Sequence, residues 1–487
     1  MLALLPAAHA SPAEIFGFGA RKMGRAGGGV AVDDGAENVL LNPAALAGRA
    51  YPELSLGFLG AEMAFSDLPP LTWDTNRDGL LNGNDAPLEL DASYDPVQAV
   101  IIGATRPIGP TLGVGFGLLV PVQRILRLST FEPALPTYFM YSNRVQSYEL
   151  GLGVGWRPWG GLAIGGGVAM IPRARYSLDA TLDLTVSAAS EGDGASDVVA
   201  MGLDVHHMQL DLIPGFSPHL AVHWDAGKAV PALRGLMLGA SWRGEAGLPV
   251  DVEIDLQINA GTEELDDLDE IVLPLVMAIQ LGVYDHYVPE QWVGGAAYTL
   301  ADTLTVSGEV RWTRWDRMQV SIAHVAASTV KGAAIDFGDN PISDGNPTDI
   351  TMQPTLSPRV GLDLRLPGID GGKHLGDIRL LTRGGFGYEP TPLVSQTAAS
   401  ALLDSDRVIF SVGVGVEHDD PFRRVIDRAA DTRRIRLDGY FQYHLLASGE
   451  LTRPEPQEPT PGYPVGGSAI PIGGHLLAAG LQWSLEY

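Results

Sequence analysis

Short segments in which apolar and polar residues alternate recur along this chain, and they restrict it to folds built from β-strands. The last segment shows the pattern with Leu477, Ala479, Leu481, Trp483, Leu485 and Tyr487 on one face, and Ala478, Gly480, Gln482, Ser484 and Glu486 on the other. Segments 303–312, 359–366 and 434–444 alternate in the same way, with their charged residues on one face. No run of about 20 apolar residues occurs, so transmembrane helices are excluded.

We count fourteen such segments, an even number as bacterial transmembrane barrels require. They lie near residues 52–65, 93–106, 111–131, 138–157, 161–187, 206–225, 234–256, 271–299, 303–322, 354–367, 376–389, 407–418, 432–447 and 473–487. Short turns at 109–110, 160–161 and 301–302 alternate with long polar connections, at 66–92, 188–205, 257–270, 323–353 and 448–472. A two-sheet β-sandwich would also alternate, but its strands would be shorter. We therefore predict an all-β fold, a 14-stranded antiparallel transmembrane β-barrel with a polar lumen, in the bacterial outer membrane.

Composition excludes several classes of protein. The formal net charge of −26 argues against a nucleic-acid partner, because a polyphosphate needs a basic surface. Cysteine is absent, so the chain has neither disulfides nor a thiolate metal site. Residues 1–10 end in Ala8-His9-Ala10 after an apolar stretch, which predicts the remnant of a signal peptide.

Residues 11–50 are rich in glycine and alanine and do not alternate. Three blocks stand out in them: Gly24-Arg25-Ala26-Gly27, Asp33-Asp34 and Asn42-Pro43-Ala44-Ala45-Leu46. They resemble the N-terminal hatch of the FadL/TodX-type family of outer-membrane transporters for long-chain fatty acids and hydrocarbons, whose barrels also have fourteen strands. The resemblance implies a hatch over 11–50 ahead of a barrel over 51–487. Its hatch and gating positions are Gly24, Arg25, Ala26, Asn42, Pro43 and Ala44.

The resemblance implies passive uptake of hydrophobic small molecules through a hatch-gated channel, and no enzymatic activity. It also implies contacts with outer-membrane lipid and lipopolysaccharide, recognition of the C-terminal strand by the barrel assembly machinery, and a monomer. Two alternatives remain at this point, a diffusion porin and an outer-membrane lipase. The lipase needs a Ser/His pair, but G-x-S-x-G is absent and no histidine (206, 207, 444 or 475) lies in a nucleophile motif, so we name no catalytic residue.

The segment 74–85 fits the calcium-loop template D-x-N-x-D-G-x-x-N-x-x-D. Oxygen ligands would come from five side chains and one backbone carbonyl, at Asp74, Asn76, Asp78, Leu80, Asn82 and Asp85. The pattern predicts a structural Ca²⁺ in an EF-hand-like loop. The alternative is an ordinary Asp/Asn-rich surface turn.

Five further residues are candidates for transport or for membrane contact. Pro121 falls within the third segment, where the family has an inward kink that opens the wall laterally; alternatively it marks the extracellular end of that strand. Arg311 and Arg434 lie on polar faces and are candidates for a ligand head group, although most such arginines should pair with Glu309, Asp363 and Asp438. Trp312 and Trp315 are predicted to belong to an aromatic girdle.

Overall fold

The computed structural model describes most of the chain from residue 15 onward. The described residues are 15–73, 86–90, 92–123, 130–131, 135–138, 140–141, 148–186, 198–246, 252–262, 271–272, 277–279, 282–283, 288–318, 321–322, 324–331, 335–336, 342–344, 351–370, 377–395, 400–419, 434–454 and 466–487. The signal-like residues 1–10 and the calcium-loop residues 74–85 therefore lie outside them. Among the described residues, no helix is long and apolar enough to span a bilayer.

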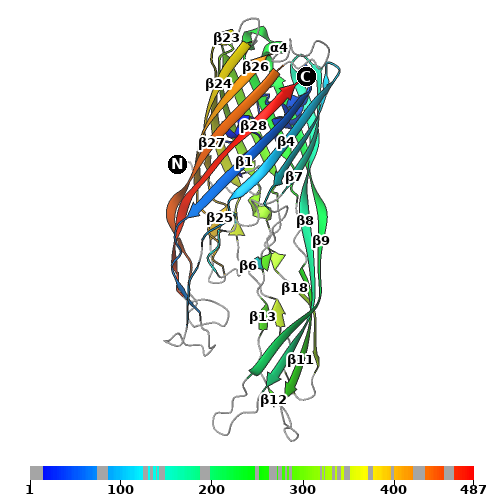
Figure 1. The fold of residues 1–487 in the computed structure, drawn as a ribbon, viewed down its shortest axis with the longest axis vertical. Coiled ribbons are helices and arrows are strands. Elements are labelled where there is room, and N and C mark those ends of the chain that lie inside the picture. Colours follow the sequence, from blue (N-terminus) through cyan, green and yellow to red (C-terminus); the bar gives the residue numbers. More distant parts are fainter. Residues whose placement is uncertain are drawn as a thin grey trace.

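Fourteen strands form a closed antiparallel barrel (Figure 1). They are β1 Glu53–Phe65, β4 Val97–Ile108, β5 Leu112–Pro121, β7 Glu149–Trp159, β8 Leu162–Val186, β9 Val198–Asp225, β10 Leu236–Arg243, β15 Gln291–Leu300, β16 Leu304–Thr313, β22 Thr355–Arg365, β24 Asp377–Glu389, β26 Arg407–Asp419, β27 Arg434–Thr452 and β28 Ala469–Glu486. Each pairs with the next, and β28 closes on β1 from Glu53↔Glu486 to Phe65↔Gly474. The predicted fold class and strand number are confirmed.

The two faces of the wall differ as the alternation predicts. On β16, Ser307, Glu309 and Arg311 are buried inside, whereas Val310 and Trp312 are exposed outside. Most of the large exposed hydrophobic side chains lie at such outward positions. A closed barrel pairs its backbone groups internally, as a bilayer demands, so the apolar outer face places the protein in a bacterial outer membrane.

Short connections gather at one end of the barrel. Ala301 and Asp302 both have positive φ, at 49° and 57°, as the two central residues of a type I′ turn require, and the Thr303 N–H donates to the Leu300 carbonyl at 2.9 Å. The β9–β10 connection holds two short helices, α4 Ala226–Ala229 and η3 Pro231–Leu233. The long connections lie at the other end (Figure 1). By the rule for outer-membrane barrels, the short-turn end faces the periplasm and the long-loop end faces outward.

Several predicted strand limits were wrong. β5 ends at 121 rather than 131, β7 begins at 149 rather than 138, β10 ends at 243 rather than 256, β15 begins at 291 rather than 271, and β16 ends at 313 rather than 322. In the other direction, β9 starts at 198, and β27 and β28 extend into the predicted loop 448–472. Alternation continues past the barrel wall, so it cannot mark where the wall ends.

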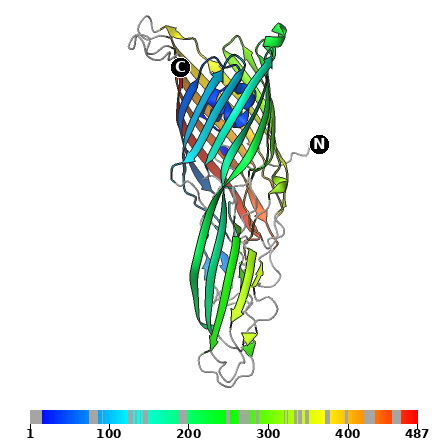
Figure 2. The ribbon, with the colours of Figure 1, turned by 90° about the vertical axis from the view of Figure 1, so that its right-hand side faces the viewer.

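Part of two predicted loops forms an outer extension of the barrel. Beyond the wall, β8 and β9 continue as a long ribbon, on which β11 (Val252–Thr262) pairs parallel to β8. β18 (His324–Lys331) in turn pairs parallel to β11, and the four strands project from the long-loop end (Figure 2). The remaining strands are short: β2 Leu71–Trp73, β3 Ala86–Leu88, β6 Thr130–Phe131, β12 Ile271–Val272, β13 Met277–Ile279, β14 Gly282–Val283, β17 Ser321–Ile322, β19 Ile335–Asp336, β20 Ile342–Asp344, β21 Thr351–Met352, β23 Ile369–Asp370 and β25 Leu393–Ser395.

Residues 15–50, here called the hatch segment, lie inside the barrel as short helical turns (Figures 1 and 2, dark blue). The turns are α2 Ala20–Met23, η1 Gly35–Glu37, α3 Asn38–Leu41 and η2 Pro43–Leu46. All but a few of these residues are buried. Because none of these turns is longer than four residues, packing against the wall must stabilise them.

Glycines in the wall make room for the hatch segment. A Cβ added at Gly165 would come within 3.0 Å of the Ala44 backbone, and one at Gly385 would meet the backbone of Arg25 in the same way. Gly239 stands equally close to the Val30 carbonyl. Glycine weakens a strand, and here it allows another backbone to approach closely.

Candidate functional site

The first hatch block is held by wall residues from the side opposite η2. The Ser411 hydroxyl donates to the Gly24 carbonyl at 3.0 Å and accepts from the Ala26 N–H at 2.7 Å. Arg25 forms ion pairs with Asp34 of the hatch segment and with Asp363 of β22, the latter at 2.6 Å. Ala26 adopts a positive φ of 56°. A non-glycine residue in this conformation is costly, so the contacts around it must compensate.

Glu309 of β16 makes a second attachment to the same turn. One carboxylate oxygen accepts from the Gly29 N–H at 2.8 Å and from the Val30 N–H at 2.9 Å. The other accepts from Arg311 at 3.0 Å. Arg311 also donates to the Gly27 carbonyl at 3.4 Å, so this candidate head-group residue contacts the hatch segment. The predicted pairing of Arg311 with Glu309 is confirmed.

The third hatch block, 42–46, joins two parts of the hatch segment to the wall. The Asn42 amide donates to the Val30 carbonyl at 2.7 Å and to the Val222 carbonyl of β9 at 3.2 Å. Its oxygen accepts from the Ala44 N–H at 3.1 Å, which caps η2, and Pro43 occupies the first position of that helix. Asn42, Pro43 and Ala44 are fully buried.

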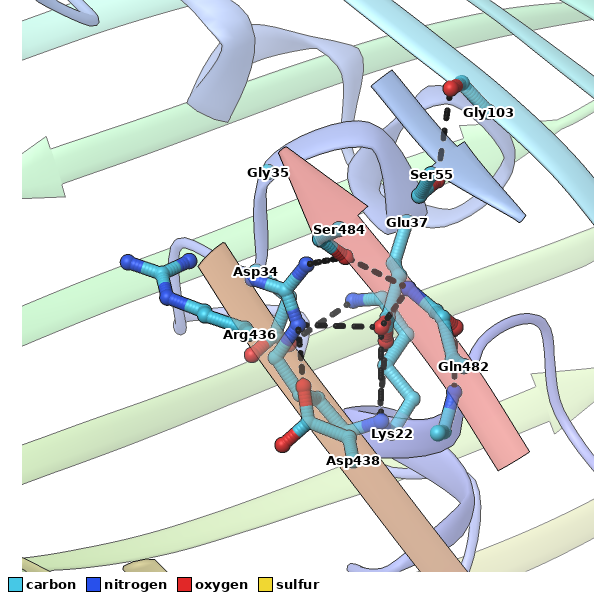
Figure 3. A network of polar contacts seen from close by, with 12 residues as sticks. Lys22, Asp34, Gly35, Glu37, Ser55, Gly103, Arg436, Asp438, Gln482 and Ser484 are labelled. Carbon is cyan, nitrogen blue, oxygen red and sulfur yellow. Dashed lines mark hydrogen bonds and ion pairs between the residues drawn. The ribbon is translucent and has the colours of Figure 1, made fainter. Parts of the chain in front are cut away.

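A buried ion network lies between the hatch segment and the strands that close the barrel (Figure 3). Arg21 pairs with Glu37 at 3.1 Å and with Glu53 of β1 at 2.5 Å. Gln482 of β28 accepts from the Ala20 N–H at 2.7 Å and donates to Glu37 at 3.0 Å. Lys22 donates to Asn38 at 2.9 Å, and burial lowers the pKa of Lys22. The sequence analysis did not identify this network, because Arg21, Glu37 and Gln482 belong to no motif.

The lumen has two tiers, and the predicted polar lumen corresponds to one of them. Inward side chains near the short-turn end are polar, as Ser484 and Gln482 are on β28. Farther along the same strand, Ala478 and Leu476 are apolar and buried. The apolar tier is one continuous cluster whose buried members include Phe16, Phe18 and Met23 of the hatch segment, Leu59 and Met63 of β1, Ile101 of β4, Leu119 of β5 and Leu446 of β27.

Two inward-folded loop segments cover the apolar tier at the long-loop end; residues 137–138, 140–141 and 400–405 are here called the cap. Thr137 donates to the Ala401 carbonyl at 3.0 Å and accepts from the Leu403 N–H at 2.8 Å. Tyr138 stacks on Phe65 with ring centroids 4.1 Å apart. Leu402 and Leu403 are fully buried in the apolar tier.

The cap contains a buried carboxyl group, Asp404. It accepts a hydrogen bond from the Thr391 hydroxyl at 2.7 Å. Burial raises the pKa of Asp404 to about 7, although the Thr391 hydrogen bond and the charge of Arg407 act to lower it.

The other candidates lie as follows. Arg434 is half-buried near the short-turn end, where it pairs with Asp419 at 2.7 Å rather than with Asp438. Pro121 is the last residue of β5, where it still faces Ala99 of β4. On its other side the pairing of β5 with β7 ends at Leu119↔Glu149, two residues before Pro121. Its role in a lateral opening stays a prediction.

The aromatic-girdle interpretation holds for one tryptophan of the pair. Trp312 is exposed on the outer face, with the Arg314 guanidinium 5.6 Å from the centre of its ring. Trp315 is fully buried in the apolar tier, on the short helix η4 (Trp315–Arg317), so its assignment to the girdle was wrong. The chain leaves the wall after Thr313, which ends the alternation.

Two cavities lie on opposite sides of the hatch segment and the apolar tier. A polar cavity of about 260 Å³ is lined on the short-turn side by Arg25, Asp34, Arg383 and Glu417, among others. An open cavity of about 610 Å³ at the outer end of β1 has an apolar floor of Met63, Phe65 and Leu68, and acidic residues Asp67 and Glu89. Within the described residues no cluster of potential ligands could hold a metal ion, and the calcium loop lies outside that part of the chain.

Comparison with known proteins identifies the fold. A FadL homologue from Pseudomonas aeruginosa superposes with a TM-score of 0.55, at 13% identity, over 96% of this chain and 98% of that one. This protein has the FadL-type barrel fold. The toluene transporters TodX of P. putida (TM-score 0.47, 11% identity, 97% and 99% covered) and TbuX of Ralstonia pickettii (0.45, 11%, 97% and 99%) align less closely. No family model and no curated sequence matches.

Proposed function

We propose that this protein is a channel for the passive uptake of hydrophobic compounds across the outer membrane, gated by its hatch segment. The observation that carries the proposal is the apolar tier, a buried hydrophobic cluster inside the barrel that includes side chains of the hatch segment itself. A diffusion porin keeps a polar, water-filled lumen, which would not attract an apolar solute. The FadL-type barrel fold, shared with the FadL homologue from Pseudomonas aeruginosa, supports this proposal.

The two cavities suggest an order of events. The apolar floor of the outer cavity at Met63 and Phe65 is contiguous with the apolar tier, since Met63 belongs to both. A ligand captured there would enter the apolar tier when the cap moves aside. The polar cavity beyond the hatch segment would oppose further passage of an apolar molecule. Release therefore requires rearrangement of the hatch segment, or an opening in the wall, for which Pro121 remains our candidate.

Permeability measurements test this function. Intact cells that carry this protein in a lipopolysaccharide-containing outer membrane should take up butylbenzene faster than cells without it, because lipopolysaccharide hinders direct partitioning of apolar solutes. The purified protein in planar bilayers should show little ion conductance. Deletion of residues 11–45 should raise permeability to small polar solutes, because a fourteen-strand barrel is too wide for wall side chains alone to fill. Large steady conductance steps from the intact chain would favour the porin, and hydrolysis of a chromogenic ester would favour the lipase. Unchanged permeability of a well-inserted deletion variant would refute gating by the hatch segment.

A further inference from the structure

The open cavity of about 610 Å³ at the outer end of β1 combines an apolar floor with negative charge. Its described lining residues include two acids, Asp67 and Glu89, and no basic residue. Both acids are exposed, and neither forms an ion pair with a described residue. An exposed carboxylate stays ionised at neutral pH, so the cavity offers two negative charges to whatever enters it.

A short hairpin brings the two acids to the same cavity. β2 and β3 pair antiparallel, with Leu71 opposite Leu88. Asp67 lies shortly before β2, and Glu89 follows β3 directly. The hairpin therefore places both carboxylates beside the apolar floor, although they are far apart in the sequence.

The floor of this cavity is partly aromatic. Phe65 lines the cavity and packs against the apolar tier. Around it lie Tyr94 and Tyr141, whose ring centroids are 5.3 Å and 5.1 Å from that of Phe65, in addition to the stacked Tyr138 of the cap. Aromatic rings attract cations as well as apolar groups, and the attraction grows as the cation loses water.

These features favour one charge class of hydrophobic molecule. A carboxylate would be repelled by both Asp67 and Glu89, and a neutral molecule would gain only from burial of its apolar surface. A protonated amine with an apolar tail would gain from the floor, the rings and the two carboxylates together. The formal net charge of −26 on the whole chain acts in the same direction, because it attracts cations from a distance.

We propose that the outer cavity captures hydrophobic amines in their protonated form, with the ammonium group at Asp67 and Glu89 and the tail on the floor at Phe65. The proposal rests on the proposed function and names the charge class of molecule that the cavity prefers. A primary amine can then give up its proton to bulk water and enter the apolar tier in its neutral form, which avoids the cost of burying a charge.

Three ligands that share one apolar tail test this proposal. At pH 7, 4-butylbenzylamine is a cation, 4-butylbenzyl alcohol is neutral and 4-butylbenzoate is an anion. Their binding is measured by calorimetry on the protein in phosphatidylcholine nanodiscs, with empty nanodiscs as the blank. Wild type should bind the amine most tightly and the benzoate most weakly. In Asp67→Asn/Glu89→Gln the amine affinity should fall roughly two- to thirtyfold, whereas the alcohol affinity should change less than about twofold.

The matched control removes the same amount of charge elsewhere. In Asp225→Asn/Glu245→Gln, one acid comes from the short-turn end, where it pairs with Lys228 at 3.1 Å, and the other from the loop that follows β10. This variant should keep the wild-type order of affinities. In wild type, raising NaCl from about 0.02 M to about 0.5 M should bring the amine and alcohol affinities closer together, because salt screens exposed charges.

Other results would overturn the proposal. Equal wild-type affinities for amine and alcohol, or an amine affinity that neither the double variant nor salt reduces, would refute the charge preference but leave hydrophobic uptake standing. An equal loss for all three ligands in the double variant would mean that the two acids only support the fold of the first loop. If that variant does not fold, the salt dependence of wild type still decides. Binding of no ligand refutes capture at the outer cavity together with the charge preference.

Discussion

Glu309 is the wall residue whose removal should release the hatch segment most directly. Its carboxylate accepts two backbone hydrogen bonds, from Gly29 and Val30, and neutralises Arg311. Hydrogen bonds to a charged group contribute about 1.5–3 kcal/mol each, so Glu309→Ala removes roughly 3–6 kcal/mol of docking free energy. It also leaves Arg311 buried without its carboxylate, which by itself costs about 3–5 kcal/mol. The two costs are not additive, because the three groups share one site.

The lower bound of about 3 kcal/mol already predicts a measurable leak. It corresponds to a roughly hundredfold increase in the population whose hatch segment has left its position on the wall. Single-channel recording in planar bilayers should show frequent openings for Glu309→Ala. Glu309→Gln keeps one acceptor oxygen and should fall between this variant and wild type.

The control for this experiment is Glu245→Ala. Glu245 pairs with Arg317 at 3.3 Å, with both side chains nearly half exposed, and such pairs contribute about 0–1 kcal/mol. The Glu245→Ala variant should therefore conduct like wild type. If Glu309→Ala inserts normally and stays as closed as the control, the contacts at Glu309 do not keep the hatch segment in place.

Three further predictions concern the wall, the cap and the first loop. In Gly165→Ala the new Cβ would clash with the Ala44 backbone, which should destabilise the docked hatch segment by about 1–3 kcal/mol and increase leakage. In Gly166→Ala the new Cβ would make only ordinary contacts, so this control variant should not leak; conductance measurements compare the two. Because the pKa of Asp404 is raised, the stability that its neutral form gives the cap is complete below about pH 4 and is lost as pH rises through about 7. The protection of residues 400–405 against hydrogen exchange, taken relative to the intrinsic exchange rate at the same pH, should therefore be higher at pH 5 than at pH 8, and Asp404→Asn should abolish this difference in protection. Calcium should bind residues 74–85 at roughly 10⁻⁴–10⁻³ M, and calorimetry should show that heat lost in the Asp74→Ala/Asp78→Ala double variant; identical heats would contradict the prediction.

The barrel could be predicted from the sequence because alternation is a property of each strand alone. Every one of the fourteen predicted segments overlaps one wall strand. Pairing with a partner is a property of two segments, and alternation does not encode it. This is why residues 252–262 looked like the end of one wall strand and the start of a loop, whereas they form β11, which pairs parallel to β8.

The hatch positions could be predicted only in part, and the reason lies in the wall. Asn42 and Arg25 stand in motifs, and they do make the contacts that join the hatch segment to β9 and β22. Their counterparts in the wall, such as Ser411 and Gly385, are single residues in strands and carry no local signal. Glycine in an alternating segment fits both faces equally well, so the sequence could not show which glycines face the hatch segment.

The division of the lumen into two tiers connects these observations. Ion pairs buried beside the hatch segment are specific in geometry and strongly coupled, so one conformation is favoured over others near it. The apolar tier beyond it has no such directional requirement, so the hydrophobic ligands proposed above could vary in shape. Glu389 pairs with Arg407 at the edge of the tier and with Arg359, which also donates to the Ala26 carbonyl of the hatch segment. One guanidinium–carboxylate chain therefore joins the edge of the apolar tier to the hatch segment, so a change in packing at Arg407 would be expected to alter the contacts of the hatch segment at Ala26.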